Sequence, residues 1–198
     1  MAKLMNWFLF EEKLKGAAVP VFTPLDIKRI FGISKIAVTF LLHRYTKRGR
    51  IIRLKRGLYS LAGVRAPDLY IANRLYEPSY VSLEFALSYH RIIPEAVYEI
   101  TSITTKATRR FEAVSKIFTY RHIQTKAFTG YCVEKMSGLS FYIAEPEKAF
   151  ADMAYFRIID KIQPANRFSK NKMNKQKVFK YAALFENRKL KEILKKIL

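Results

Sequence analysis

Residues 23–60 constrain the fold of this chain most, because they place two short helices and a basic hairpin in immediate succession. Thr23 is a favourable N-cap residue, and Pro24 follows at the first helical position, where its missing N–H costs nothing. A short helix is therefore predicted from Pro24 through Ile30. Gly32 ends it, because glycine leaves the helical conformation easily.

A second helix is predicted to begin after Ser34, which can serve as its N-cap. Its apolar residues recur at helical spacing and share one face: Val38, Leu41, Leu42 and Tyr45. Gly49 ends the helix at the position where glycine is most favoured. We expect the apolar face to pack on a core.

A hairpin with a basic tip is predicted next. Residues 51–54 form one strand, residues 55–57 the turn and residues 58–61 the returning strand. Helix, turn, helix and hairpin in this order predict a winged helix-turn-helix domain over residues 1–62. In such a domain the second helix is the candidate DNA reader.

The positive charge of the chain is concentrated at its two ends. Residues 1–62 hold 13 Lys and Arg against 3 Asp and Glu, residues 63–160 hold 12 against 11, and residues 161–198 hold 12 against 2. Basic ends around a neutral middle are typical of a polyanion-binding module with a basic tail. Six basic residues of the first block lie within ten positions: Lys47, Arg48, Arg50, Arg53, Lys55 and Arg56.

Composition excludes several classes of protein. Half of the residues are apolar, which supplies cores for one or two domains and excludes a disordered chain. The single Cys132 excludes an internal disulfide framework, and without a Cys/His cluster we expect neither a metal nor another cofactor. No apolar run reaches the ~20 residues of a membrane span. Within residues 3–16 an apolar patch runs directly into charged residues, which favours an amphipathic first helix over a signal peptide. Because a single cysteine suits a reducing compartment, a cytoplasmic location is expected.

The face of the second helix opposite its apolar stripe is the predicted reader of DNA bases. At 100° per residue this face holds Ile36, Phe40, His43 and Lys47, with Lys35 and Thr39 on a flank. The N-terminal part of such a helix enters the major groove, so Lys35, Ile36 and Thr39 are expected to lie deepest. Lys35 can donate to guanine O6 or N7, Thr39 can pair with several bases, and Ile36 can contact a thymine methyl group.

The full set of predicted DNA-contacting residues adds the helix cap and the basic residues of the wing. Lys47 and Arg50 are placed for phosphates. The set is Ser34, Lys35, Ile36, Thr39, Phe40, His43, Lys47, Arg50, Arg53, Lys55 and Arg56. If roughly half of the basic residues contact phosphates, affinity should fall steeply with salt.

Three of these assignments have an alternative. Phe40 can equally well be covered by the first helix or by the wing. His43 can be solvated or face a phosphate, and it has no neighbouring His or Cys with which to bind a metal. The basic run over residues 47–56 can be a merely solubilising surface, as charge runs usually are, but its coincidence with the wing favours binding.

Residues 63–160 are predicted to form a small mixed domain, which makes the whole chain α+β. Helices are expected over residues 67–76 and 82–89, separated by a break at 77–79. Strands are expected over residues 96–104, 109–111, 115–121 and 138–144. A further helix opens around Pro146, with acidic residues in its first turn, and runs toward Phe156.

This middle domain offers no catalytic motif, and the chain is not expected to be an enzyme. Glu145, Glu147 and Asp152 are close in sequence, but the last two are five residues apart and share a helix face poorly. The sequence contains no Ser/His/Asp set, P-loop, dinucleotide-binding or zinc-protease motif. Lys148 precedes Asp152 by four residues, and we interpret the two as an ion pair on the helix surface.

Five pieces of the sequence occur in a characteristic order. They are Gly49 to Tyr59, Pro78 to Leu87, Thr101-Ser102, Arg110-Phe111, and Ala144 to Ala149 with Asp152. Together they resemble the AbiEi antitoxins of type IV toxin-antitoxin systems, and the resemblance covers roughly residues 20–156. It implies an N-terminal winged helix that represses its own operon and a C-terminal domain that neutralises a nucleotidyltransferase-like toxin. Such antitoxins are thought to counter the effect of the toxin, so a stable complex is not implied.

By position, the resemblance assigns Arg53, Lys55, Arg56 and Gly57 to operator binding. It assigns the segments around residues 79–87 and 145–152 to the antitoxin domain. Ser82 and Glu84 are better interpreted as the opening of a helix than as a functional surface.

The basic tail, residues 161–198, is no defining feature of this family. Its lysines gather between residues 170 and 180, and a helical run follows in which four apolar residues share a face: Leu190, Ile193, Leu194 and Ile197. The tail can be a second phosphate-binding surface, a dimerisation helix, or a helix docked on its own domain with its lysines outward. The last is the default interpretation.

The sequence therefore predicts a sequence-specific repressor, acting on its own operon, that is also an antitoxin. The expected partners are double-stranded DNA with operator repeats and, functionally, a nucleotidyltransferase-like toxin; no membrane is expected, and the protein is a monomer or weak dimer. The alternative is a winged-helix module that binds protein or RNA, with basic ends that give only general polyanion affinity. An enzyme acting on nucleic acid would need clustered carboxylates or a metal site.

Overall fold

The computed structural model describes residues 6–17, 19–162 and 167–198 of the chain. The chain divides into two compact units, Met1–Pro67 and Asp68–Leu198. Each unit has its own sheet and its own buried apolar residues.

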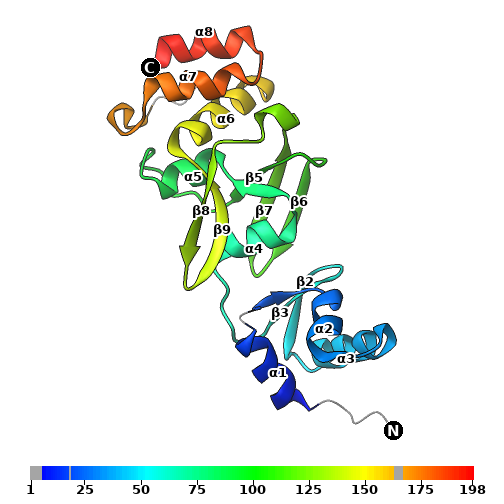
Figure 1. Cartoon of the computed structure of the whole chain (residues 1–198). Coiled ribbons are helices and arrows are strands. Elements are labelled where there is room, and N and C mark those ends of the chain that lie inside the picture. The colour runs from blue at the N-terminus through cyan, green and yellow to red at the C-terminus, as the bar shows by residue number, and fades with distance from the viewer. Residues whose placement is uncertain (1–5, 18, 163–166) are drawn as a thin grey trace. The chain divides into compact units, whose positions relative to one another are not determined.

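The first unit combines three helices with a small antiparallel sheet (Figure 1). Its elements are α1 (Trp7–Gly16), β1 (Val21–Phe22), α2 (Pro24–Phe31), α3 (Lys35–Lys47), β2 (Ile51–Lys55) and β3 (Leu58–Leu61). The strand order is β1-β3-β2. Helix, turn, helix and hairpin follow one another as predicted, whereas the two-residue β1 escaped prediction because it exists only through its pairing with β3.

Local capping explains where these helices begin and end. The Asp26 amide donates to the Thr23 hydroxyl oxygen at 3.2 Å, and the Thr23 amide donates to the Asp26 carboxylate at 2.8 Å, which is a reciprocal capping box at the start of α2. Gly32 follows α2 in the left-handed region, with φ +63°. The Ser34 side chain then accepts from the Ala37 amide at 3.2 Å and caps α3.

The predicted apolar stripe of α3 is confirmed as the core of the first unit. Its four residues are at most 5% exposed: Val38, Leu41, Leu42 and Tyr45. They pack with buried residues of the other elements, namely Phe10, Leu14, Phe22, Ile27, Ile51 and Leu61. Trp7 of α1 meets Tyr45 edge-on, with 4.9 Å between ring centroids. The amphipathic first helix therefore belongs to this unit, although residues 3–5 of its predicted range lie outside the described residues.

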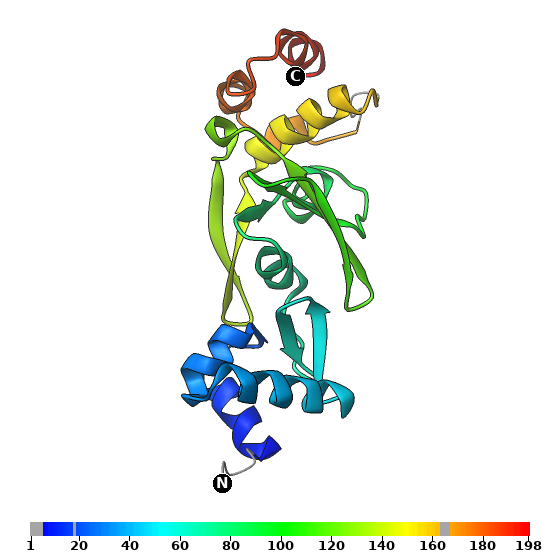
Figure 2. The ribbon, with the colours of Figure 1, turned by 90° about the vertical axis from the view of Figure 1, so that its right-hand side faces the viewer.

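The second unit is built around a six-stranded mixed sheet of order β6-β7-β5-β4-β9-β8. Its first elements are α4 (Asp68–Leu75), β4 (Ser79–Val81), α5 (Leu83–Tyr89), β5 (Ile100–Thr104), β6 (Arg109–Ala113) and β7 (Lys116–His122). They are followed by η1 (Thr125–Ala127), β8 (Tyr131–Met136), β9 (Leu139–Ala144), α6 (Pro146–Ile159), η2 (Lys170–Lys172), α7 (Lys175–Ala183) and α8 (Arg188–Ile197). Figure 2 shows α4 nearly end-on, between the β6–β7 and β8–β9 hairpins.

This α+β architecture confirms the predicted fold class, but two of its strands differ from expectation. The predicted break between the two helices is present at residues 77–78, but Ser79 already belongs to β4, which was not predicted and lies inside the sheet between β5 and β9. The edge strand β8 was not predicted. The expected strand over residues 96–104 begins only at Ile100. A three-residue strand such as β4 carries no usable periodicity of its own and is defined by its two partners.

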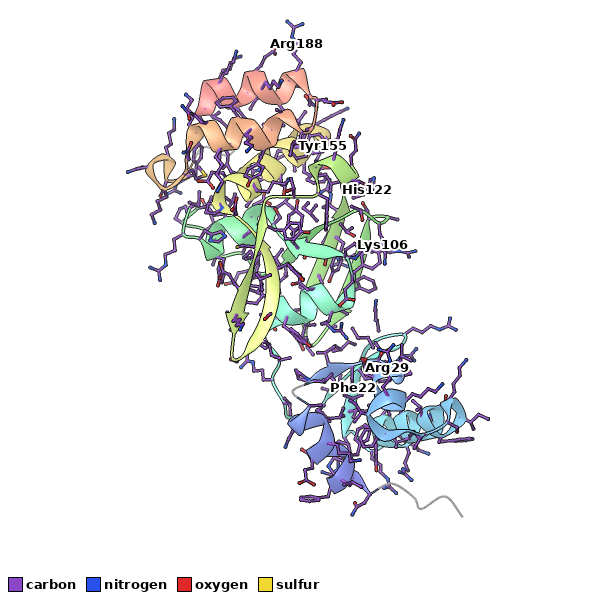
Figure 3. The ribbon with its side chains drawn as sticks, in the orientation of Figure 1. Phe22, Arg29, Lys106, His122, Tyr155 and Arg188 are labelled. Atoms are coloured by element: carbon purple, nitrogen blue, oxygen red, sulfur yellow. The ribbon has the colours of Figure 1, made fainter. Side chains whose placement is uncertain are left out.

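The basic tail is docked on its own unit, which is the default interpretation. Helices α7 and α8 pack on α6 and on each other. Their inward residues are fully buried: Val178, Ala182, Leu190 and Leu194. The lysines of both helices face outward with few exceptions, and Arg188 projects away from the helix pair into solvent (Figure 3).

Candidate nucleic-acid interface

The outward face of α3 carries the predicted base-contacting residues in exposed positions. Ser34, Lys35, Thr39, His43 and Lys47 are all exposed. Ile36 and Phe40, one helical turn apart, are each 70% exposed. The alternative in which the first helix or the wing covers Phe40 is therefore wrong.

The two hydroxyl groups of this face are already partly used by the helix. Ser34 accepts the capping hydrogen bond at the start of α3. The Thr39 hydroxyl donates to the Lys35 carbonyl oxygen at 3.0 Å. Because its proton is engaged, the hydroxyl of Thr39 faces a base as an acceptor, which suits the amino groups of adenine and cytosine.

The charged side chains of the helix-turn-helix and the wing are almost all positive. From Ile27 to Pro67 the chain contains 11 Lys and Arg and no Asp or Glu. Within the part of the chain that the structure describes, no ion pair neutralises Lys35, Lys47, Arg53 or Arg56. Unneutralised positive charge along an exposed helix and its neighbouring hairpin is the electrostatic footprint of a polyanion-binding surface.

The wing is the β2–β3 hairpin. Ile51 and Leu54 are buried, whereas Arg53 and the turn residue Arg56 are exposed and Lys55 is half-buried. Gly57 supplies the positive φ, +78°, that the turn requires. The hairpin therefore presents two arginines outward, Arg53 from β2 and Arg56 from the turn, while Ile51 anchors β2 in the core.

Arg50 occupies different surroundings from the other predicted contacts. Its guanidinium lies over the ring of Trp7, 5.7 Å from the ring centroid, on α1. Arg50 follows the C-terminal end of α3, and the 13 residues of that helix span about 20 Å. The structure thus separates Arg50 from Lys35 at the opposite end of the helix.

Two further exposed basic residues were not in the predicted set. Lys28 and Arg29 lie on α2, the first helix of the helix-turn-helix. In this motif the first helix crosses the DNA backbone. The two adjacent basic residues are visible in the sequence, but they become candidate phosphate contacts only once α2 is recognised as the helix that crosses the DNA backbone.

In the second unit, the interpretation of Lys148 and Asp152 as a surface pair is wrong. The two residues do form an ion pair, but both side chains are completely buried. Asp152 also accepts hydrogen bonds from the hydroxyls of Ser82, at 2.8 Å, and Tyr80, at 3.1 Å. Burial raises the pKa of Asp152, and Lys148 and the two hydroxyls act against that rise. Ser82 thus precedes α5 as expected, but its hydroxyl serves Asp152 rather than the helix.

The other two carboxylates of this segment dock the basic tail on α6. Glu145 accepts from the Tyr181 hydroxyl at 2.5 Å and pairs with Lys177 at 2.9 Å. Glu147 accepts from the Asn174 amide at 3.0 Å. The hydrogen bond from Tyr181, followed by the contact with Lys177, lowers the pKa of Glu145. These carboxylates have structural partners and do not form an acid and base pair around an open site.

The fold and the exposed face of α3 define the first unit as a winged helix-turn-helix domain. Residues 18–62, from just before β1 to the end of the wing, match the family model described as "Transcriptional regulator, AbiEi antitoxin". The N-terminal part of the chain is therefore an AbiEi antitoxin transcriptional regulator domain, and the resemblance is confirmed there. The second unit lies outside the match, and no curated protein matches the chain. Among the described residues, no helix is both long and apolar enough to cross a bilayer.

Proposed function

We propose that this protein is a sequence-specific DNA-binding repressor of its own operon and the antitoxin of a type IV toxin-antitoxin system. One observation carries the first part: an exposed helix face and wing without acidic residues, within a domain that matches a family of transcriptional regulators. The expected ligand is double-stranded DNA with operator repeats.

In the proposed complex, α3 enters the major groove with its N-terminal half. Lys35 donates to guanine O6 or N7, and Thr39 accepts from an amino group of adenine or cytosine. Arg53 and Arg56 of the wing contact the sugar-phosphate backbone beside the groove, as Lys47 does near the end of α3. Phosphate contacts then set affinity and register, whereas the base contacts set specificity.

The second unit would carry the antitoxic activity. Its segment 145–152, to which the resemblance assigns this role, uses its carboxylates to hold the basic tail and the buried Lys148. We therefore assign no reaction to it and propose a non-enzymatic antitoxin. Co-expression with a neighbouring nucleotidyltransferase-like gene tests this role. Growth must be restored by the full chain, and toxicity that persists in its presence would refute the antitoxin assignment.

A competition experiment tests the DNA-binding function. Duplexes are selected from a random library by the full-length protein, and the best-bound duplex is compared with random duplex at one salt concentration. A specific repressor should prefer its site by ~10³-fold or more. Equal affinities would instead favour the alternative function, a module with general polyanion affinity, which the basic tail also supports.

A double variant, Lys35→Ala with Thr39→Ala, locates the specificity. It should relax base preference, because each good base contact is worth ~1 to 3 kcal/mol. Lys135→Ala, an exposed lysine on β8, serves as the charge-matched control and should leave selectivity unchanged. Selectivity that survives the double change would show that α3 does not read the bases in this register.

A further inference from the structure

Two large apolar side chains are exposed on the helix face to which the proposed function assigns base contacts. Ile36 and Phe40 are each 70% exposed, and their spacing of four residues places them on one face in the first two turns of α3. Neither contributes to the buried core cluster of the first unit. Their apolar surface is thus available to a partner.

The surroundings of these two residues favour DNA over a protein as that partner. The exposed charged residues of α3 are all basic, and the wing adds Arg53 and Arg56. A polyanion complements such a surface. Within the major groove of DNA, the apolar group that a side chain can meet is the C5-methyl group of thymine, and a methylated cytosine presents the same group at the same position.

The spacing of the two residues suits more than one base pair. Four residues of α-helix advance about 6 Å along the helix axis. Successive bases along one DNA strand are separated by about 3.4 Å. Ile36 and Phe40 therefore reach different base pairs, with Lys35 and Thr39 beside them for hydrogen bonds.

We propose that Ile36 and Phe40 determine operator specificity by packing against the C5-methyl groups of thymines at two positions of the site. This inference rests on the proposed function of the same helix and names the chemistry that it recognises. Ile36 and Phe40 supply apolar contact, whereas the flanking Lys35 and Thr39 supply polar contacts.

The test removes the methyl groups and nothing else. In the best-bound duplex selected by the full-length protein, each thymine is replaced singly by deoxyuridine, which keeps every hydrogen-bonding group. Affinity should fall about fourfold at each thymine that is contacted, as expected for burial of one methyl group. Ile36→Ala and Phe40→Ala should each lower affinity for the thymine duplex and become insensitive to deoxyuridine at one position.

A matched control is available in the same unit. Phe8 on α1 is also 70% exposed, so Phe8→Ala removes an equally exposed aromatic ring from a different helix. It should bind both duplexes as the unmodified protein does. Because all three substituted residues are exposed, the variants should keep the circular dichroism spectrum and melting temperature of the parent.

A second arm separates the methyl group from the base that carries it. Replacing a contacted T·A pair by C·G should weaken binding, and replacing it by 5-methylcytosine·G should recover part of the loss. No recovery at either position would show that a different feature of thymine is recognised and would overturn the proposal.

The outcomes also separate this inference from the proposed function. If deoxyuridine duplexes bind as well as thymine duplexes and the selected duplex is still preferred over random duplex, the inference about Ile36 and Phe40 is overturned but the proposed function stands. If the Ile36→Ala and Phe40→Ala variants bind DNA as the parent does, the inference is likewise overturned, and this face of α3 is a protein-docking face instead. A parent protein without preference for selected duplex overturns both.

Discussion

Replacing Lys148 by methionine should destabilise the second unit strongly. Both Lys148 and Asp152 are completely buried, so Lys148→Met leaves a carboxylate in the interior without its cation. The hydroxyls of Tyr80 and Ser82 still donate to Asp152 but cannot neutralise it. Breaking a buried ion pair by removing one partner costs ~3 to 5 kcal/mol. The total free energy of unfolding of a domain is only ~5 to 15 kcal/mol.

A second substitution distinguishes lost charge compensation from lost packing. Adding Asp152→Asn to Lys148→Met removes the buried charge and keeps an acceptor for the two hydroxyls. The double variant should therefore recover more than half of the stability that Lys148→Met loses. If the single variant suffered only from poor packing, the second change would recover nothing.

The pH dependence of Lys148→Met provides a further check. Burial already raises the pKa of Asp152 above its ordinary value of 3.8, and loss of the opposing Lys148 should raise it further. A carboxyl whose folded-state pKa is raised favours the fold when it is protonated. That contribution is complete below the unfolded-state pKa and is lost as pH rises through the folded-state pKa. The free energy of unfolding that Lys148→Met loses relative to the parent should thus be smaller at pH 4 than at pH 7.

Urea unfolding of the full chain can follow the two units separately. Trp7, the single tryptophan, lies in the first unit, whereas all but Tyr45 and Tyr59 of the 12 tyrosines lie in the second. Lys148→Met should shift the transition seen by near-ultraviolet circular dichroism of tyrosine and leave that of tryptophan fluorescence unchanged. A loss below ~1 kcal/mol at pH 7 would refute the reasoning, because it is far less than a bare buried carboxylate costs.

Three further predictions concern both units. Leu42→Ala should cost the first unit ~2 to 5 kcal/mol, seen in the tryptophan fluorescence transition; a loss under ~1 kcal/mol would contradict its place in the core. Arg53→Ala and Arg56→Ala should weaken binding to every duplex and lower the salt slope by about one for each phosphate that is no longer neutralised, whereas a changed base preference would argue against a backbone role. The pKa of Glu145 is lowered from 4.5, so the stability it contributes is present above that pH and is lost as pH falls through its folded-state pKa. The protection of α7 against hydrogen exchange, corrected for the intrinsic exchange rate, should therefore decrease as pH falls below 4.5, and Glu145→Gln should abolish this decrease; an unchanged acid transition in that variant would exclude Glu145 as its cause.

Much of the first unit was predictable because its signals are local. Thr23, Gly32 and Ser34 act on backbone groups within four residues of themselves. The stripe of Val38 and Leu42 needs only the period of the helix to define which face is buried. The outward face then follows by geometry, and so does the exposure of its candidate contacts.

The environment of α6 could not be predicted in the same way. The spacing of Lys148 and Asp152 gives a helical pair in any α-helix, and an isolated pair of this kind is normally solvated. In the fold, every residue from Glu147 to Ala154 is buried, because α5 and the sheet cover part of the helix and the tail helices cover the rest. Phe185, whose ring centroid lies 4.9 Å from the Lys148 ammonium, comes from a segment 37 positions later.

By itself, then, the sequence determined the winged helix, its capping residues, its core face and the sign of its charge, since each depends on neighbours within one or two turns. Tertiary structure alone decided that β4 is an interior strand, that Lys148 and Asp152 are buried, and that the basic tail packs on α6. Each of these depends on partners distant in sequence. Pairing across a sheet and burial between helices leave no periodic mark on the short segments that undergo them.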